Sequence, residues 1–154
     1  MALEIHYREA TKADIPAMAK IRSAIWETTE FWNERIEGYM NGQSNPTDAL
    51  PLRQLFVATS ENVVVGFTAG HCSTRYGCEG ELQWINVVPD FHRNGIATAL
   101  VRHLAAWFDK QQVHRVCTDV DPGNIIARNF YQHLGATPLN KSWMTWTDIG
   151  VLLK

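Results

Sequence analysis

The residues best suited to chemistry in this sequence lie in the segment Pro89–Ala97, where a strand-like stretch changes into a helix-like one. Pro89 ends the strand, Arg93 brings a full positive charge, and Gly95 opens the helix. A turn of this kind leaves several backbone N–H groups pointing at one spot beside the positive end of the helix dipole. Such a place binds phosphate or pyrophosphate with few side chains. The alternative is an ordinary strand–helix connection that Pro89 and Gly95 merely punctuate.

Helices are expected on both sides of this loop. The helix over Gly95–Gln111 has one apolar stripe, made of Ile96, Leu100, Val101, Leu104, Trp107 and Phe108. Another helix follows the capping sequence Thr11–Asp14, and its apolar side is made of Ile15, Met18, Ile21, Ile25 and Trp26. Two more helices are expected over Phe31–Met40 and Ile125–Leu134.

Alternating polar and apolar residues, bounded by turn formers, predict the strands. They are expected over Ala2–Glu9, Leu55–Thr59, Val63–Cys72, Glu81–Val88, Val113–Val120, Ala136–Leu139 and Trp143–Ile149. The turn-rich residues 41–51 are expected to form a loop. The alternation of strands and helices from Glu81 onward favours an α/β (α+β) fold. We expect a mixed sheet with a parallel central pair of strands, flanked by about four helices.

Composition and charge argue against several functions. The 154 residues fit a single domain spanning 1–154. A net charge of -2 without a Lys/Arg cluster disfavours nucleic acid as a partner, and no apolar run approaches the ~20 residues of a membrane span. Three cysteines without a Cys-x-x-Cys pair predict reduced thiols in a cytoplasmic protein. The six histidines show no ligand spacing, so no metal site is expected.

Two motifs carry a resemblance to a known family. His92-Arg93-Asn94-Gly95-Ile96-Ala97 resembles the acyl-CoA pyrophosphate loop of the GNAT acetyltransferases, Gln/Arg-x-x-Gly-x-Gly/Ala, with His92 in place of the usual first residue. The segment Asn124–Ala136 resembles the second signature of that family, N-x-x-A-x-x-F-Y-x-x-x-G-F, with Ala136 in place of Phe. The order of elements is also that of the family, so the resemblance covers nearly the whole chain.

The resemblance implies acetyl-CoA as co-substrate. Arg93–Ala97, with Thr98, would hold the diphosphate, and the strand end Asn86–Val88 would bind the pantetheine arm where a bulge parts it from the next strand. The N–H of Val87 or Val88 would donate to the thioester oxygen; an ordinary paired strand is the alternative. The residues expected to bind the cofactor are Val87, Val88, His92, Arg93, Asn94, Gly95, Ile96, Ala97, Thr98, Asn124, Ala127 and Tyr131.

Acid–base roles are assigned to Tyr131 and Glu81. A tyrosine with a pKa of ~10 can protonate a leaving thiolate whose thiol has a pKa of about 8.5, although Tyr131 also fits a core aromatic. Asn124 is expected to cap its helix. The resemblance places a carboxylate at Glu81 as general base, acting through water. Glu79, water alone, and a merely solvated Glu81 are the alternatives.

The acceptor is expected to be a primary amine of a small molecule or peptide, attacked directly in a ternary complex. Trp32 and Tyr39 are candidates for lining its pocket, together with the acidic Glu27, Glu30 or Glu34, which would suit a cation. Ordinary packing of these rings is the alternative. A non-catalytic acyl-CoA-binding sensor on the same fold is the competing function. A homodimer through the last strands, Trp143–Leu153, is left open.

Replacing Trp32 by Ala is expected to raise the Michaelis constant for the acceptor, because the hypothesis gives this ring direct contact with it. Steady-state kinetics at saturating acetyl-CoA measure this constant. An unchanged value would remove Trp32 from the acceptor pocket.

Overall fold

Seven strands form one mixed sheet in the computed structural model, which describes residues 3–154, in the order β1-β2-β3-β4-β5-β7-β6. The strands are β1 (His6–Glu9), β2 (Ala49–Ser60), β3 (Val63–Ser73), β4 (Gly80–Val87), β5 (Val116–Asp119), β6 (Thr137–Asn140) and β7 (Trp143–Trp146). The α-helices are α1 (Ile15–Ser23), α2 (Thr29–Asn41), α3 (Ile96–Lys110) and α4 (Ile125–His133). This order, the parallel pair β4–β5 and the mixed sheet confirm the predicted fold class.

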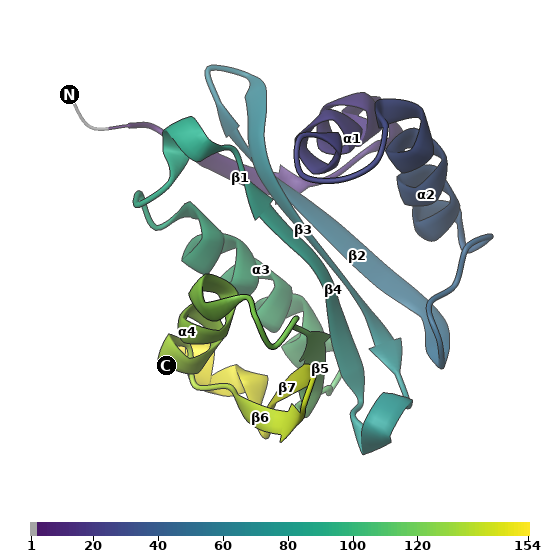
Figure 1. The fold of residues 1–154 in the computed structure, drawn as a ribbon, viewed down its shortest axis with the longest axis vertical. Helices are drawn as coiled ribbons and strands as arrows, with labels where there is room; N and C mark the ends of the chain where they lie inside the picture. The colour runs from purple at the N-terminus through teal and green to yellow at the C-terminus, as the bar shows by residue number, and fades with distance from the viewer. Residues whose placement is uncertain (1–2) are drawn as a thin grey trace.

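The helices lie in two layers, with α1 and α2 on one face of the sheet and α3 and α4 on the other (Figure 1). The apolar stripe of α3 is confirmed, since Leu100, Val101 and Leu104 are fully buried. The capping box before α1 is also confirmed: the Thr11 N–H donates to Asp14 Oδ2 at 2.8 Å. Each layer therefore buries its own apolar side on the sheet, in a separate core cluster.

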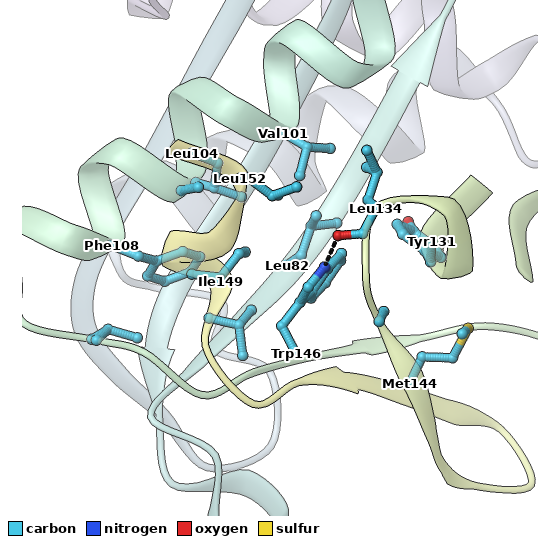
Figure 2. Packing of buried hydrophobic residues seen from close by; sticks show 14 of the residues in the cluster. Leu82, Val101, Leu104, Phe108, Tyr131, Leu134, Met144, Trp146, Ile149 and Leu152 are labelled. Carbon is cyan, nitrogen blue, oxygen red and sulfur yellow. Dashed lines mark hydrogen bonds between the residues drawn. The ribbon is translucent and has the colours of Figure 1, made fainter. Parts of the chain in front are cut away.

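The C-terminal half of the core packs around Trp146 (Figure 2). Its indole N–H donates to the Leu134 carbonyl at 3.1 Å, which ties β7 to the end of α4. The predicted strand Trp143–Ile149 is too long, because β7 ends at Trp146 and Ile149–Leu153 forms a 3₁₀-helix. Ile149 is fully buried in the α3 cluster, and this packing turns the chain away from the sheet.

Other predicted boundaries shift as well, and the strand predicted over Val113–Val120 is shorter, since β5 spans Val116–Asp119. The first strand begins at His6 rather than Ala2, a residue that lies outside the described part of the chain. Helix α1 ends at Ser23, so Ile25 and Trp26 are exposed instead of lying on its buried side. Strand β2 begins at Ala49, inside the predicted loop, because it pairs there with Ser73 of β3.

Strands β4 and β5 pair only at their beginnings and then part. Their parallel register runs through Gly80–Leu82 alone, while β4 continues along β3 as far as Val87. The bulge that accompanies the parting lies at Gln83, because Leu82 and Trp84 pair with successive residues of β3. The expectation of a bulge at Asn86–Val88 is corrected to this earlier position. Beyond Leu82 one edge of β4 has no neighbouring strand, and the sheet opens into a fork.

Replacing Leu104 by Ala is expected to lower the free energy of unfolding by about 2–5 kcal/mol, because the deletion leaves a cavity under α3. Chemical denaturation measures this change. Leu52→Ala serves as the matched control, since Leu52 is 56% exposed and its truncation should stay within about 0.5 kcal/mol. Equal losses in the two variants would contradict the assignment of the core to the α3 face.

Candidate active site

A cleft of about 1920 Å³ opens at the fork and extends from the α1–α2 connection to the loop before α3. Nearly all of the residues that were predicted to form the site line it: Trp32, Glu81, Val87, Val88, His92, Arg93, Gly95, Ile96, Ala97, Thr98, Asn124, Ala127 and Tyr131. Two predicted residues, Tyr39 and Asn94, are not among its lining residues. The fold thus brings together segments that lie up to a hundred residues apart in the chain.

The loop before α3 presents a row of backbone amides. Gly95 (φ 73°) and Arg93 (φ 65°) both have left-handed backbone conformations, which turn successive N–H groups toward one side. Within the described residues, none of the N–H groups from Arg93 to Thr98 has a hydrogen-bond acceptor. The loop can therefore accept an anion without breaking any bond of its own.

Two side chains of the same loop, those of His92 and Asn94, form hydrogen bonds that stabilise its backbone. The imidazole of His92 donates from Nε2 to the Val87 carbonyl at 2.7 Å, which ties the loop to the end of β4. The Asn94 amide donates to the carbonyls of Phe91 and His92, each at 3.1 Å. Asn94 consequently holds the loop in shape, with its side chain directed to the loop backbone.

The free edge of β4 supplies a backbone donor at the fork. The Val88 N–H is already used, because it donates to the Val65 carbonyl at 2.9 Å. Successive residues of a strand direct their N–H groups to opposite edges. The Val87 N–H therefore points to the edge that β5 has left, where the Val87 carbonyl meets His92. Of the two residues named as oxyanion donors, Val87 is the one whose backbone N–H points to the open edge of β4.

Tyr131 reaches the fork from α4. Its side chain is 5% exposed, and its ring packs perpendicular to Trp146 at 5.7 Å between centroids. Burial raises the pKa of Tyr131 to about 12, while the neighbouring Thr118 hydroxyl and the charge of Arg22 oppose the rise. The Asn124 side chain accepts the Ala127 N–H at 3.1 Å, so its predicted cap on α4 is confirmed.

Glu81 lies on the inner wall of the cleft with only 3% of its surface exposed. Its Oε1 lies 3.6 Å from His71 Nε2 and 3.8 Å from Arg75 Nη1. Glu79 has a different role: its exposed carboxylate accepts the N–H groups of His114 (2.9 Å) and Arg115. Those bonds lower the pKa of Glu79 and brace the turn before β5, away from the cleft. Of these two carboxylates, Glu81 lines the cleft and Glu79 does not.

The sequence model of the acetyltransferase (GNAT) family matches residues 16–136. The chain belongs to this GNAT family. It is 28% identical over 86 residues to the aminoglycoside N(6')-acetyltransferase type 1 of Salmonella typhimurium, which covers 52% of this chain and 59% of that protein. The chain therefore spans less than two thirds of this curated relative.

Solved GNAT structures share the fold at low sequence identity. The aminoglycoside 6'-acetyltransferase type Ii superposes with a TM-score of 0.75 at 20% identity, covering 94% of this chain and 97% of that one. The PaiA N-acetyltransferase of Thermoplasma acidophilum, solved in complex with coenzyme A, gives a TM-score of 0.71 at 16% identity and covers 95% and 99%.

Arg22 of this GNAT chain enters the cleft from α1 and was missed in the sequence. Its Nη1 donates to Asn86 Oδ1 at 3.1 Å, and its guanidinium lies 4.4 Å from the centre of the Trp32 ring. Its Nε is buried without a partner in the described chain, and burial lowers its pKa. No local pattern in the sequence points to Arg22, because its contact with Asn86 joins residues that lie 64 positions apart in the chain.

The acceptor side of the GNAT cleft differs from the expectation. Trp32 lines it and is fixed by its own indole N–H, which donates to the Trp26 carbonyl at 2.6 Å. Tyr39 is 1% exposed and its hydroxyl bonds to His71, so it lies behind the wall of the cleft and cannot contact an acceptor directly. The acids Glu27, Glu30 and Glu34 face solvent outside the lining, which Trp26 and Phe31 form instead.

No group of His, Cys, Asp and Glu residues within 3–154 is arranged to hold a metal ion. Across the same residues, every helix is too short or too polar to cross a bilayer. All three cysteines are buried and unpaired.

Replacing Gly95 by Glu is expected to raise the calorimetric Kd for coenzyme A by at least roughly tenfold, since two like charges 4 Å apart repel by about 4 kcal/mol near a protein surface. Gly42→Glu is the matched control. Gly42 also has a left-handed backbone (φ 81°) and open space around its Cβ position, but lies outside the cleft. Equal affinity of both variants would contradict the assignment of the diphosphate site.

Proposed function

We propose that this protein is an N-acetyltransferase that transfers the acetyl group of acetyl-CoA to a primary amine of a small molecule or peptide. The amine attacks the thioester directly in a ternary complex. The single observation that carries the proposal is one cleft that joins the free amides of Arg93–Thr98, the open edge of β4, Tyr131 and Glu81. Acetyl-CoA is the co-substrate of this reaction.

The loop before α3 and the open edge of β4 bind different parts of acetyl-CoA. The amides of Arg93–Thr98 and the Arg93 side chain bind the diphosphate, and the helix dipole of α3 adds to their field. The pantetheine arm then follows the open edge of β4 toward Tyr131. There the Val87 N–H donates to the thioester oxygen, a contact that typically lowers the barrier by about 2.7–4 kcal/mol.

Glu81 acts as the general base and Tyr131 as the general acid. An alkylamine with a pKa of about 10.4 is almost wholly protonated at neutral pH, so Glu81 takes up its proton directly or through water. The nitrogen then forms a bond to the acetyl carbon, and the C–S bond breaks with its electron pair on sulfur. Tyr131 protonates that sulfur, and the second proton that the nitrogen loses on becoming an amide returns through the cleft to the Tyr131 phenolate. Because its pKa is about 12, transfer occurs only as charge builds on sulfur, beside the Thr118 hydroxyl and the Arg22 cation.

No ping-pong step is proposed. Cys72 and Cys117 are buried, and burial raises the pKa of both thiols, so neither is a ready nucleophile. The names of two similar proteins, both aminoglycoside acetyltransferases, support a small-molecule amine as the first acceptor class to test.

An acceptor panel with acetyl-CoA, followed by release of free thiol, tests the function. Small polyamines, amino-acid amides, aminoglycosides and peptides with free N-termini form the panel. At least one class is expected to release thiol well above the rate without acceptor. Tight binding of acetyl-CoA with no release across the panel would contradict an enzyme and favour an acyl-CoA sensor.

Tyr131→Phe is expected to lower kcat by roughly 10²-fold and to leave the KM for acetyl-CoA unchanged, because the lost proton acts only on the leaving group. Tyr7→Phe, which removes a hydroxyl outside the cleft, should retain full activity.

The wild-type pH profile provides a second test of Tyr131. An acid with a pKa of about 12 stays protonated throughout the assay range. The ratio kcat/KM should therefore rise as the amine loses its proton and should not fall before about pH 10. A decline that begins near pH 8 and is absent in Tyr131→Phe would show that the hydroxyl titrates far lower than its burial implies.

A further inference from the structure

Three buried polar side chains form a line that ends at the proposed base. Tyr39 of α2 places its hydroxyl 2.8 Å from Nδ1 of His71 on β3, and Nε2 of the same ring lies 3.6 Å from Glu81 Oε1 on β4. All three side chains are almost completely buried, and His71 has no exposed surface. Each comes from a different element, so the line exists only in the folded chain.

The hydroxyl of Tyr39 determines which nitrogen of His71 carries the proton. If the hydroxyl donates to Nδ1, the neutral ring has its hydrogen on Nε2, aimed at the Glu81 carboxylate. In the reverse arrangement, an Nε2 lone pair would face a carboxylate and the Tyr39 hydrogen would lack an acceptor. Within the described residues, neither His71 Nε2 nor Glu81 Oε1 has a hydrogen-bond partner, and the 3.6 Å between them is slightly longer than a hydrogen bond. The first arrangement is therefore the favourable one.

We propose that His71, with its tautomer fixed by Tyr39, is a positioning residue for Glu81. Its Nε2–H is directed at Oε1 across 3.6 Å and restrains that oxygen at the inner wall by electrostatic attraction, which leaves Oε2 as the oxygen available to the amine in the cleft. The proposal rests on the proposed function of Glu81 as general base. It also gives Tyr39 a role behind the cleft wall, in place of the acceptor contact that its burial prevents.

Arg75 makes this restraint necessary. Its guanidinium lies 3.8 Å from Glu81 Oε1 and 4.2 Å from the centre of the Trp143 ring at the mouth of the cleft. Without the His71 donor, the carboxylate would turn toward this cation and form a closer ion pair. An ion-paired carboxylate is a weaker base. His71 thus keeps the base directed at the amine.

The same line does not conduct protons out of the site. Beyond His71 it ends at Tyr39, which is 1% exposed and lies under the guanidinium of Arg53, 4.9 Å from the ring centre. A proton passed to His71 would therefore have no route to solvent. The proton that Glu81 takes up must leave through the cleft, where Asp119 and Asp121 line the opening.

Two similar substitutions of His71 separate positioning from a purely structural role. The amide nitrogen of Gln reaches the place of Nε2, so His71→Gln keeps a donor on Glu81. Asn reaches only the place of Nδ1, so His71→Asn keeps a partner for Tyr39 and loses the donor on Glu81. We expect His71→Asn to lose at least roughly tenfold in kcat and His71→Gln to retain most of it. Coenzyme A affinity by calorimetry should be unchanged in both.

The variant Glu81→Gln separates the positioning role of His71 from the role of Glu81 as the base. If His71 acts through Glu81, His71→Asn should cost nothing further in the Glu81→Gln background, although Glu81→Gln alone is strongly impaired. Equal kcat in His71→Asn and His71→Gln, or additive losses in the double variant, would overturn the positioning role and leave the proposed enzyme intact. Full activity of Glu81→Gln would overturn the base and the positioning role together. The absence of thiol release with any acceptor in the wild type would mean that the proposed function itself is wrong.

Discussion

The site depends on the loss of pairing between β4 and β5 after Leu82. A parallel pair normally satisfies the backbone of both strands along its length, and an exposed edge must be covered or used. Here the Thr118 hydroxyl donates to the Leu82 carbonyl at 3.1 Å, and the bulge at Gln83 accompanies the parting of β4 from β5. The remaining edge, up to Val87, then has backbone groups to offer to a ligand.

The layers of helices keep the fork open and supply its chemistry from opposite sides. The α3–α4 layer contributes the amide loop and Tyr131, while the α1–α2 layer contributes Arg22 and Trp32. The cations lining the cleft exceed the acids: Lys20, Arg22, Arg35, Arg75 and Arg93 against Glu81, Asp119 and Asp121. This balance suits an anionic donor and favours the neutral, reactive form of a bound amine.

Local patterns in the sequence were sufficient for the order of elements, the α3 stripe, the caps at Thr11 and Asn124, and the loop before α3, since each is determined within a few residues. The remaining features depend on distant partners. The bulge at Gln83 follows the end of the pairing with β5, and the Tyr39 hydroxyl of α2 finds its buried partner in His71 of β3. Arg22 acquires its place only through Asn86, 64 residues away. No local periodicity encodes such contacts.

A titration of isotopically labelled protein with coenzyme A, followed by the backbone amide resonances, tests the central claim most directly. The account predicts that the amides of Arg93–Thr98 shift most, because the diphosphate binds them, and that Val87 shifts with them as the thiol arm enters the fork. If these amides stay in place while others shift, or if nothing shifts at saturating coenzyme A, the amide loop is not the diphosphate site and the mechanism built on it is wrong.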